Sequence, residues 1–170
     1  MLEVNSKMIR IILFVLFLVT TVCPVKGQEA ATIIDDQFAQ LPFGQVLTPG
    51  NIHKFVSGSF TTKKDTLRNN NTGNIDTLLI FKSASNEFSF LQTPERVLFY
   101  GATIVTPDVL LTKDVKIGLS KDRFMDIFGF NQEFSKSDPL VIKDSIEYCY
   151  QAFFFKNKKL MRIVLNGCLD

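Results

Sequence analysis

The chain has 170 residues, of which 46% are hydrophobic and 21% are charged, so it is long enough for one folded domain and is not typical of a disordered protein. Three of the 19 basic residues and one of the 17 acidic residues lie in residues 1–27, which leaves 16 of each in the remainder. This balance argues against nucleic-acid binding through a basic surface. The 17 Phe residues can supply a large apolar core.

Residues 1–27 have the pattern of a signal peptide. Lys7 and Arg10 precede an apolar run over residues 11–22, which is shorter than the about 20 residues that span a bilayer. A cleavage site of small residues ends at Gly27. The pattern predicts an exported protein, periplasmic or secreted, with no stable membrane span after cleavage.

The leader leaves two alternatives open. Met8 is an alternative start, because the chain that begins there has a more usual signal-peptide opening. Cys23 raises the alternative of a lipid anchor like that of bacterial lipoproteins. The bulky Val22 in front of it favours a soluble product over lipidation.

The rest of the chain is predicted to form one globular domain over residues 46–170, preceded by a lead-in segment over residues 28–45. The lead-in has weak periodicity, and a short helix around residues 33–41 is an alternative for it. Segments rich in β-branched and aromatic residues predict strands. They span residues 52–62, 75–82, 87–91, 97–105 and 109–117.

The clearest helix is predicted over residues 121–128. Ser120 is a good N-cap, and Gly129 supplies the stop signal. Leu119 and Phe124 have the spacing of a hydrophobic staple. With strands before this helix and a hairpin after it, we expect an α+β domain: a mostly antiparallel sheet with one or two short helices packed on one face.

Cys149 and Cys168 are the two cysteines left after cleavage, and an even pair in an exported protein is a candidate disulfide. Residues 145–155 and 160–168 alternate between apolar and polar side chains around a polar turn, which predicts an antiparallel hairpin. With Lys158-Lys159 as the loop, the cysteines lie directly opposite each other, within disulfide range. We favour a structural disulfide over two free thiols.

The same alternation predicts which face of the hairpin is buried. The apolar set is Ile146, Tyr148, Tyr150, Ala152 and Phe154 in the first segment, and Met161, Ile163 and Leu165 in the second. Glu147, Cys149 and Gln151 lie on the other face of the first segment. Packing the two apolar sets together places both cysteines on the polar face.

No residue pattern points to catalysis or to a cofactor. His53, the only histidine, lies beside a turn, and no G-x-S-x-G motif accompanies it. Neither a metal-ligand cluster nor a phosphate-binding glycine loop is evident. The acidic pair Asp35-Asp36 and the basic pairs Lys63-Lys64 and Lys158-Lys159 are interpreted as solvated residues. We therefore expect a protein that is not an enzyme, without a cofactor or metal.

Residues 115–129, read as VKIGLSKDRFMDIFG, resemble the helix entry of small exported domains with the β-lactamase-inhibitor-protein-like fold. That group includes outer-membrane-assembly lipoproteins of the SmpA/OmlA type. Ile117, Gly118, Ser120 and Gly129 fit its pattern, and the following hairpin up to residue 168 resembles the strands that come next. The resemblance implies a sheet that presents one face to a protein partner.

Two functions therefore follow as hypotheses. We favour a non-enzymatic protein-binding module of the cell envelope, whose partner is another envelope or extracellular protein. The alternative is an extracytoplasmic carrier of a small hydrophobic ligand or lipid, in which the abundant Phe lines a pocket. The abundant Phe residues can also be explained without a ligand, as side chains that only form the hydrophobic core.

Overall fold

The computed structural model describes residues 30–68, 73–146 and 148–168, so the predicted signal peptide lies outside the described residues. The strands are β1 (Ala31–Ile34), β2 (Thr61–Arg68), β3 (Ile75–Ser83), β4 (Asn86–Gln92), β5 (Val97–Ile104), β6 (Leu140–Lys143), β7 (Tyr150–Lys156) and β8 (Lys159–Asn166). The α-helices are α2 (Asp36–Gln40) and α3 (Lys121–Phe128). Three short 3-10 helices are η1 (Ile52–Lys54), η2 (Thr112–Asp114) and η3 (Gln132–Lys136).

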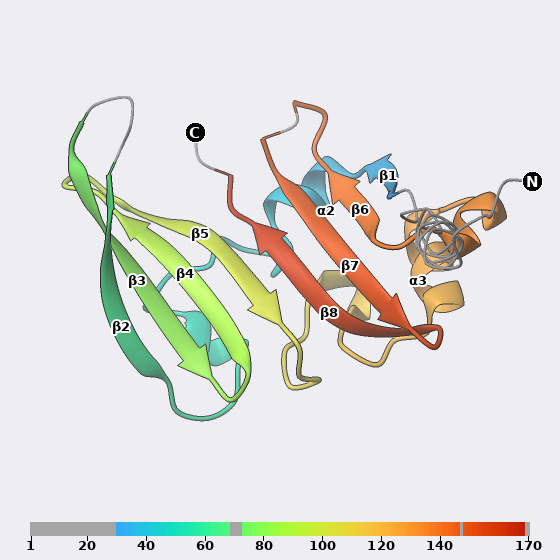
Figure 1. The fold of residues 1–170 in the computed structure, drawn as a ribbon, viewed down its shortest axis with the longest axis horizontal. Helices are drawn as coiled ribbons and strands as arrows, with labels where there is room; N and C mark the ends of the chain where they lie inside the picture. The colour runs from blue at the N-terminus through green and yellow to red at the C-terminus, as the bar shows by residue number, and fades with distance from the viewer. Residues whose placement is uncertain (1–29, 69–72, 147, 169–170) are drawn as a thin grey trace, which may run out of the picture.

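The strands form a single eight-stranded sheet in the order β1-β6-β7-β8-β5-β4-β3-β2 (Figure 1). β1 runs parallel to β6, and the other neighbouring pairs are antiparallel. The predicted α+β class with a mostly antiparallel sheet is therefore confirmed, although strands dominate the fold. The sheet consists of two antiparallel groups, β2–β5 and β6–β8, which meet where β5 pairs with β8.

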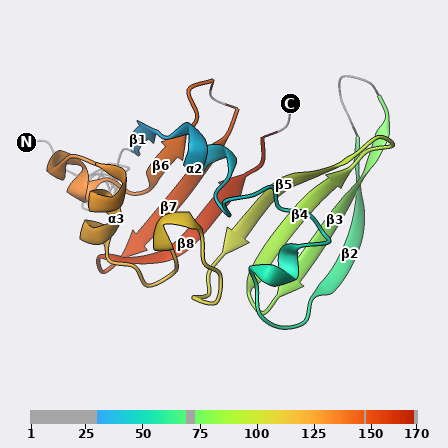
Figure 2. The same cartoon turned by 180° about the vertical axis from the view of Figure 1, so that it is seen from behind.

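Both α-helices pack on the same face of the sheet (Figure 2). α2 and α3 cover β6–β8, and the segment around η1 covers the β3–β5 region. Phe side chains fill the interface in two groups of ring contacts. The first contains Phe43, Phe55, Phe60, Phe81, Phe88, Phe90 and Phe99, and the second contains Phe38, Phe124, Phe128, Phe130, Phe134, Phe153 and Phe155. We call the opposite side of the sheet the open face.

The predicted helix over residues 121–128 is confirmed with its caps. The Ser120 side chain accepts a hydrogen bond from the Arg123 N–H, and Gly129 adopts the left-handed conformation (φ 71°) that ends the helix. Phe124 and Phe128 are buried on the core side. The helix is short, so its stability depends on this packing.

Three of the predicted strands are confirmed, with small shifts at their ends, as β3, β4 and β5. The strands expected over residues 52–62 and 109–117 are wrong. Residues 52–54 form η1 and residues 112–114 form η2, and the apolar residues of these segments are used to cover the sheet instead.

Three strands escape prediction for physical reasons. β2 is an edge strand whose residues are exposed along almost its whole length, so it lacks the alternation of a half-buried strand. β1 and β6 have four residues each, too few for a periodic pattern. The segment predicted as a lead-in over residues 28–45 contains β1 and α2, and the helix agrees with the alternative stated for that segment.

The predicted hairpin exists, but its loop is wrong. Lys156 pairs with Lys159, so the two loop residues are Asn157 and Lys158. Both have positive φ, 51° and 59°, as a type I′ turn requires. A register shift between Phe154 and Phe155 leaves Met161 outside the paired positions of the ladder.

The predicted buried face of β7 is also wrong. Cys149, Gln151 and Phe153 point into the core, whereas Tyr150 is 48% exposed on the open face. The run of three Phe at 153–155 makes both faces of this strand apolar, so alternation could not decide between them. In β8, Ile163 and Leu165 are buried as predicted, but Met161 is 49% exposed because the bulge turns it out of the core.

Asp35 fixes α2 to the rest of the molecule. Its carboxylate accepts hydrogen bonds from the Phe38 N–H (3.1 Å), as an N-cap does, and from Lys113 Nζ (2.6 Å). Burial raises the pKa of Asp35, but the hydrogen bonds with Lys113 and Phe38 and the charge of Lys113 outweigh burial. The pKa of this carboxyl therefore lies below its ordinary value.

Asp35→Asn is expected to lower stability at pH 7 and to make it less sensitive to acid. Because the folded-state pKa is depressed, the stabilisation by ionised Asp35 is present above the unfolded-state value of about 4 and is lost as pH falls through the folded-state value. Urea unfolding at steps from neutral pH into the acid range measures this effect. A stability difference that stays constant across the series would contradict the assignment, and Lys113→Gln should reduce the same pH dependence.

Gly167 lets the chain run directly against β5 before it reaches Cys168. Its N–H donates to the Tyr100 carbonyl (3.0 Å), and a Cβ at this position would lie 1.9 Å from the Phe99 carbonyl oxygen. No side chain fits at that distance without movement of the backbone.

Gly167→Ala is expected to destabilise the fold by about 1–3 kcal/mol, because the added methyl group overpacks the contact with β5. Chemical unfolding compares this variant with Gly50→Ala, where the nearest atom to a new Cβ is Thr48 Oγ1 at 3.8 Å. The control should differ little from the parent. Equal stability of the two variants would show that the close approach is not maintained in solution.

Candidate functional site

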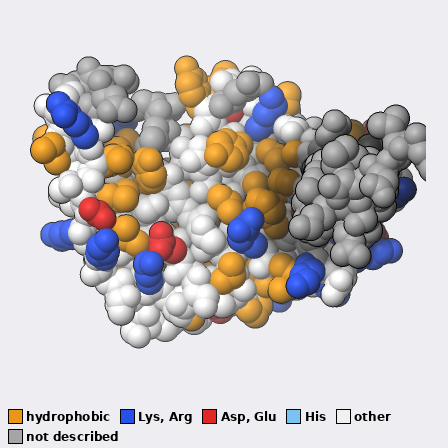
Figure 3. Space-filling view, viewed as in Figure 1, with side chains coloured by type: hydrophobic (Ala, Val, Ile, Leu, Met, Phe, Trp, Pro, Cys, Tyr) orange, Lys and Arg blue, Asp and Glu red, His pale blue; other side chains and the backbone are white. Residues whose placement is uncertain are grey.

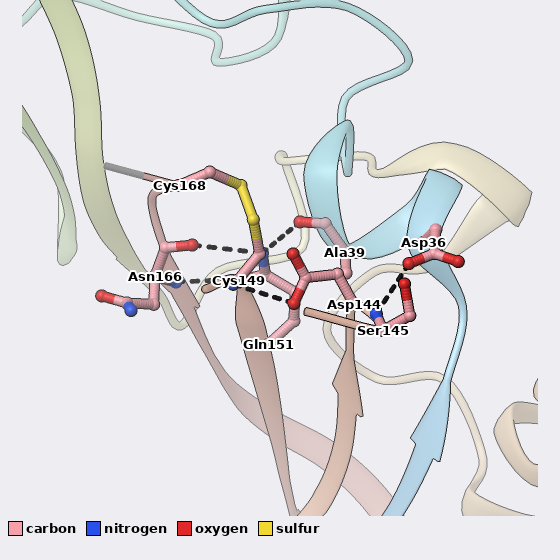
Figure 4. Close-up of a disulfide and its surroundings, with 8 residues drawn as sticks. All are labelled: Asp36, Ala39, Asp144, Ser145, Cys149, Gln151, Asn166 and Cys168. Atoms are coloured by element: carbon pink, nitrogen blue, oxygen red, sulfur yellow. Dashed lines mark hydrogen bonds between the residues drawn. A yellow bond between two sulfur atoms is a disulfide. The ribbon is translucent and has the colours of Figure 1, made fainter. Parts of the chain in front are cut away.

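The disulfide between Cys149 and Cys168 ties the start of β7 to the end of the described chain (Figure 4). The two Cα atoms are 4.9 Å apart. The predicted pairing is thus confirmed, but its predicted setting is wrong, because Cys149 belongs to the buried core. The ladder between β7 and β8 ends at Gln151 and Leu165, so the bridge holds the segments beyond the last paired residues.

Gln151 is a buried polar residue on the core side beside the disulfide. Its side-chain amide donates to the carbonyls of Ala39 (2.6 Å) and Asn166 (3.3 Å), and its side-chain oxygen accepts from the Asn166 N–H (3.1 Å). These bonds satisfy the polar group and connect α2, β7 and β8. Because its polar atoms are hydrogen-bonded, Gln151 can lie on the buried face of β7.

Asp144 shapes the turn that precedes Cys149 (Figure 4). Its side chain is fully buried, and Oδ1 accepts from the Cys149 N–H (3.2 Å), while its backbone N–H donates to the Cys149 carbonyl (3.1 Å). Among the described residues Oδ2 has no hydrogen-bond partner. A cavity of about 180 Å³ lies here, lined by Gln40, Asp144, Ile146, Cys149 and Cys168.

Replacing both cysteines by alanine is expected to lower stability by about 3 kcal/mol, since the bridge closes a loop between residues 19 positions apart. Urea unfolding with and without reductant measures the change. The parent should lose stability in reductant, whereas the double variant should not respond. A parent that is indifferent to reductant would mean that the bond contributes nothing to the fold.

His53 lines a cavity of about 420 Å³, together with Phe43, Phe55, Asp108 and Leu110 among others. The imidazole is exposed, and among the described residues it has no hydrogen-bond or ion-pair partner. Asp108 is engaged elsewhere: it accepts hydrogen bonds from Thr106 and, at 3.4 Å, from Asn86. The geometry does not assemble His53 and Asp108 into a catalytic pair.

The other candidate residues are scattered. The acidic pair at 35–36 serves structure, since Asp35 caps α2 and Asp36 accepts from the Ser145 N–H (2.7 Å). Within the parts of the chain that the structure describes, no group of three or more His, Cys, Asp or Glu could hold a metal ion. Cys23, considered as a lipid attachment site, lies outside the described residues.

The open face over β6–β8 is the feature that the sequence did not predict. Pairing registers place successive rows of side chains across it: Ile34, Lys143 and Tyr150, then Thr32, Val141, Ala152 and Val164, then Phe154 and Arg162. Val141, Ala152, Val164 and Phe154 are apolar, and neither α2 nor α3 covers this side of β6–β8 (Figure 1). Predicting which side chains lie on this face would have required knowing which face of β7 is buried and where the register of β8 shifts.

The open face is hollowed where β5 meets β8. Gly101 has no side chain there, and a Cβ would lie 2.9 Å from the Leu165 carbonyl oxygen. A cavity of about 180 Å³ results, lined on this face by Ser89, Tyr100, Thr103, Val164 and Asn166 among others. The apolar rows of β6–β8 therefore border a shallow groove.

The architecture defines the protein as an α+β domain with helices on one side of an eight-stranded sheet. Comparison of the chain with protein-family models, curated proteins and solved structures found no match. None of the helices among the described residues is long and apolar enough to cross a membrane.

Proposed function

We propose that this protein is an exported, non-enzymatic binding module that presents the open face of β6–β8 to another protein of the envelope or extracellular space. One observation carries the proposal: the half-buried apolar side chains of Val141, Val164 and Phe154 lie in neighbouring rows on this half of the sheet, and no helix of the described residues covers them. Antiparallel sheets tolerate a solvated face, but that face is normally polar. An apolar open face indicates a surface that is covered in a complex.

Aromatic side chains strengthen this interpretation. Tyr150 is 48% exposed on the open face, and Tyr148 and Ile146, in the turn at the adjacent end of β7, are 61% and 59% exposed. Ile34 is 60% exposed in the same row as Tyr150. Tyr is enriched at protein interfaces because its ring buries apolar area while its hydroxyl stays hydrogen-bonded.

Export is supported by two independent features. The leader has the pattern of a signal peptide. The Cys149–Cys168 bond is of the kind that persists in oxidising compartments outside the cytosol. The likeness of residues 115–168 to exported binding domains points the same way.

The alternative of a hydrophobic-ligand carrier has less support. Fourteen Phe rings pack against one another between the sheet and the elements that cover it. The cavity of about 420 Å³ has His53, Lys54 and Asp108 in its lining, which does not suit an apolar ligand. Co-purified lipid in an organic extract of the protein would favour the carrier.

A photo-cross-linking residue at Tyr150 is expected to trap a discrete protein adduct in the protein's own cells, because this side chain lies on the open face. The control carries the same group at Arg123, an exposed residue of α3 on the covered side of the sheet. Mass spectrometry identifies the adduct. Adducts at both positions, or at Arg123 alone, would contradict the assignment of the open face as the binding surface.

A further inference from the structure

The two halves of the open face differ in how their charges are arranged. On the β2–β5 half, cations are neutralised within the sheet: Lys63 pairs with Asp65 (3.0 Å), and Lys82 pairs with Glu87 (2.7 Å). Figure 3 looks onto this face: over β2–β5 it shows acidic side chains among basic and hydrophobic ones, and over β7 and β8 it shows hydrophobic and basic side chains.

On the β7–β8 half, three cations gather without such partners. The register pairs Phe154 with Arg162 and Lys156 with Lys159, which places all four side chains on the open face in neighbouring rows. Within the described residues, none of the three cations takes part in an ion pair. Residues 148–168 contain four basic residues and no acidic one. We call Phe154, Lys156, Lys159 and Arg162 the basic surface.

Arg162 lies over an aromatic ring rather than beside a carboxylate. Its guanidinium carbon is 4.0 Å from the centre of the Phe154 ring, and this cation–π contact holds the group over the ring. A guanidinium so held keeps its N–H donors at its edge, where a carboxylate can accept two of them. The ring and its neighbour Val164 supply apolar contact area on the same face.

We propose that the basic surface binds an extended acidic segment of the partner protein, an inference that rests on the function proposed above. Rows on this face that are two residues apart along β7 are separated by about 7 Å. An extended segment has the same spacing between alternate side chains, so acidic residues at every second position can meet Arg162 and the Lys156–Lys159 row. Charge complementarity of this kind selects the partner and speeds association.

Other anionic partners fit the surface less well. Phe154 is half-buried beneath the Arg162 guanidinium, so it is not placed to insert into a lipid bilayer. Residues 28–170 carry equal numbers of acidic and basic side chains, which does not suit a polyanion such as nucleic acid. A peptide can combine carboxylates with apolar side chains over a few residues, as this surface requires.

The test uses a fluorescein-labelled peptide in which Glu and Val alternate, read by fluorescence anisotropy with the disulfide-bonded mature protein. We expect saturable binding that weakens as salt is raised. Arg162→Glu should reduce the affinity by about tenfold or more, and Lys156→Glu with Lys159→Glu should do the same. Arg123→Glu, on the covered side, should leave it within about twofold. Circular dichroism confirms that each variant is folded.

Three results would overturn the inference. They are no binding of the Glu peptide, equal binding of a peptide with Lys in place of Glu, or affinity that Arg162→Glu does not change. A different outcome would assign the basic surface to lipid instead. In that outcome the Glu peptide does not bind, the protein sediments with phosphatidylglycerol vesicles, and Arg162→Glu abolishes this sedimentation. A cross-link at Tyr150 that persists in Arg162→Glu would keep the proposed function and reject the acidic partner. Peptide binding without any Tyr150 adduct would keep the acidic ligand of the basic surface and reject the proposed protein-binding function of the open face.

Discussion

The fold depends on the junction between β5 and β8. These strands pair over only four residues, Gly101–Ile104 with Ile163–Asn166, yet this ladder joins the two antiparallel groups into one sheet. Two glycines make the approach possible, because side chains at Gly101 and Gly167 would meet backbone oxygens of the opposing strand. Both groups of Phe rings then lie on one side of a continuous sheet, where α2, α3 and the η1 segment cover them.

The junction also accounts for the character of the open face. Since α2 and α3 both lie on the Phe side, no helix of the described residues covers the opposite side of β6–β8, and apolar residues in those strands are partly exposed there. Where the β2–β5 half carries side chains of both charges in pairs, the β7–β8 half carries cations around a Phe. The open face therefore has one part where Lys63 and Lys82 pair with carboxylates, and one part where three cations have no ion-pair partner among the described residues.

Local signals were enough for some elements and not for others. The caps at Ser120 and Gly129 define α3, and β-rich runs bounded by turns define β3, β4 and β5. β2 could not be recognised, since an exposed edge strand has no apolar alternation. The buried face of β7 could not be predicted, because Phe153, Phe154 and Phe155 are equally apolar. The polar Gln151 lies on the buried face, which a pattern of apolar residues assigns to solvent. The disulfide was predictable from the two cysteines that lie beyond the leader and from the alternation of the hairpin, whereas the open face depends on where α2 and α3 pack, which is a tertiary property.

The position of β8 has a consequence for how the chain can fold as it emerges. β8 is the last strand in the sequence but occupies the middle of the sheet, between β7 and β5. Until it arrives, β5 is an unpaired edge, and the Phe side of β2–β5 has no neighbouring group to complete the core. A chain that folds as it emerges N-terminus first therefore completes this sheet only after residues 159–166 have emerged. Because Cys168 follows β8, the Cys149–Cys168 disulfide can close only after β8 has emerged, and it then ties the end of β8 to the start of β7.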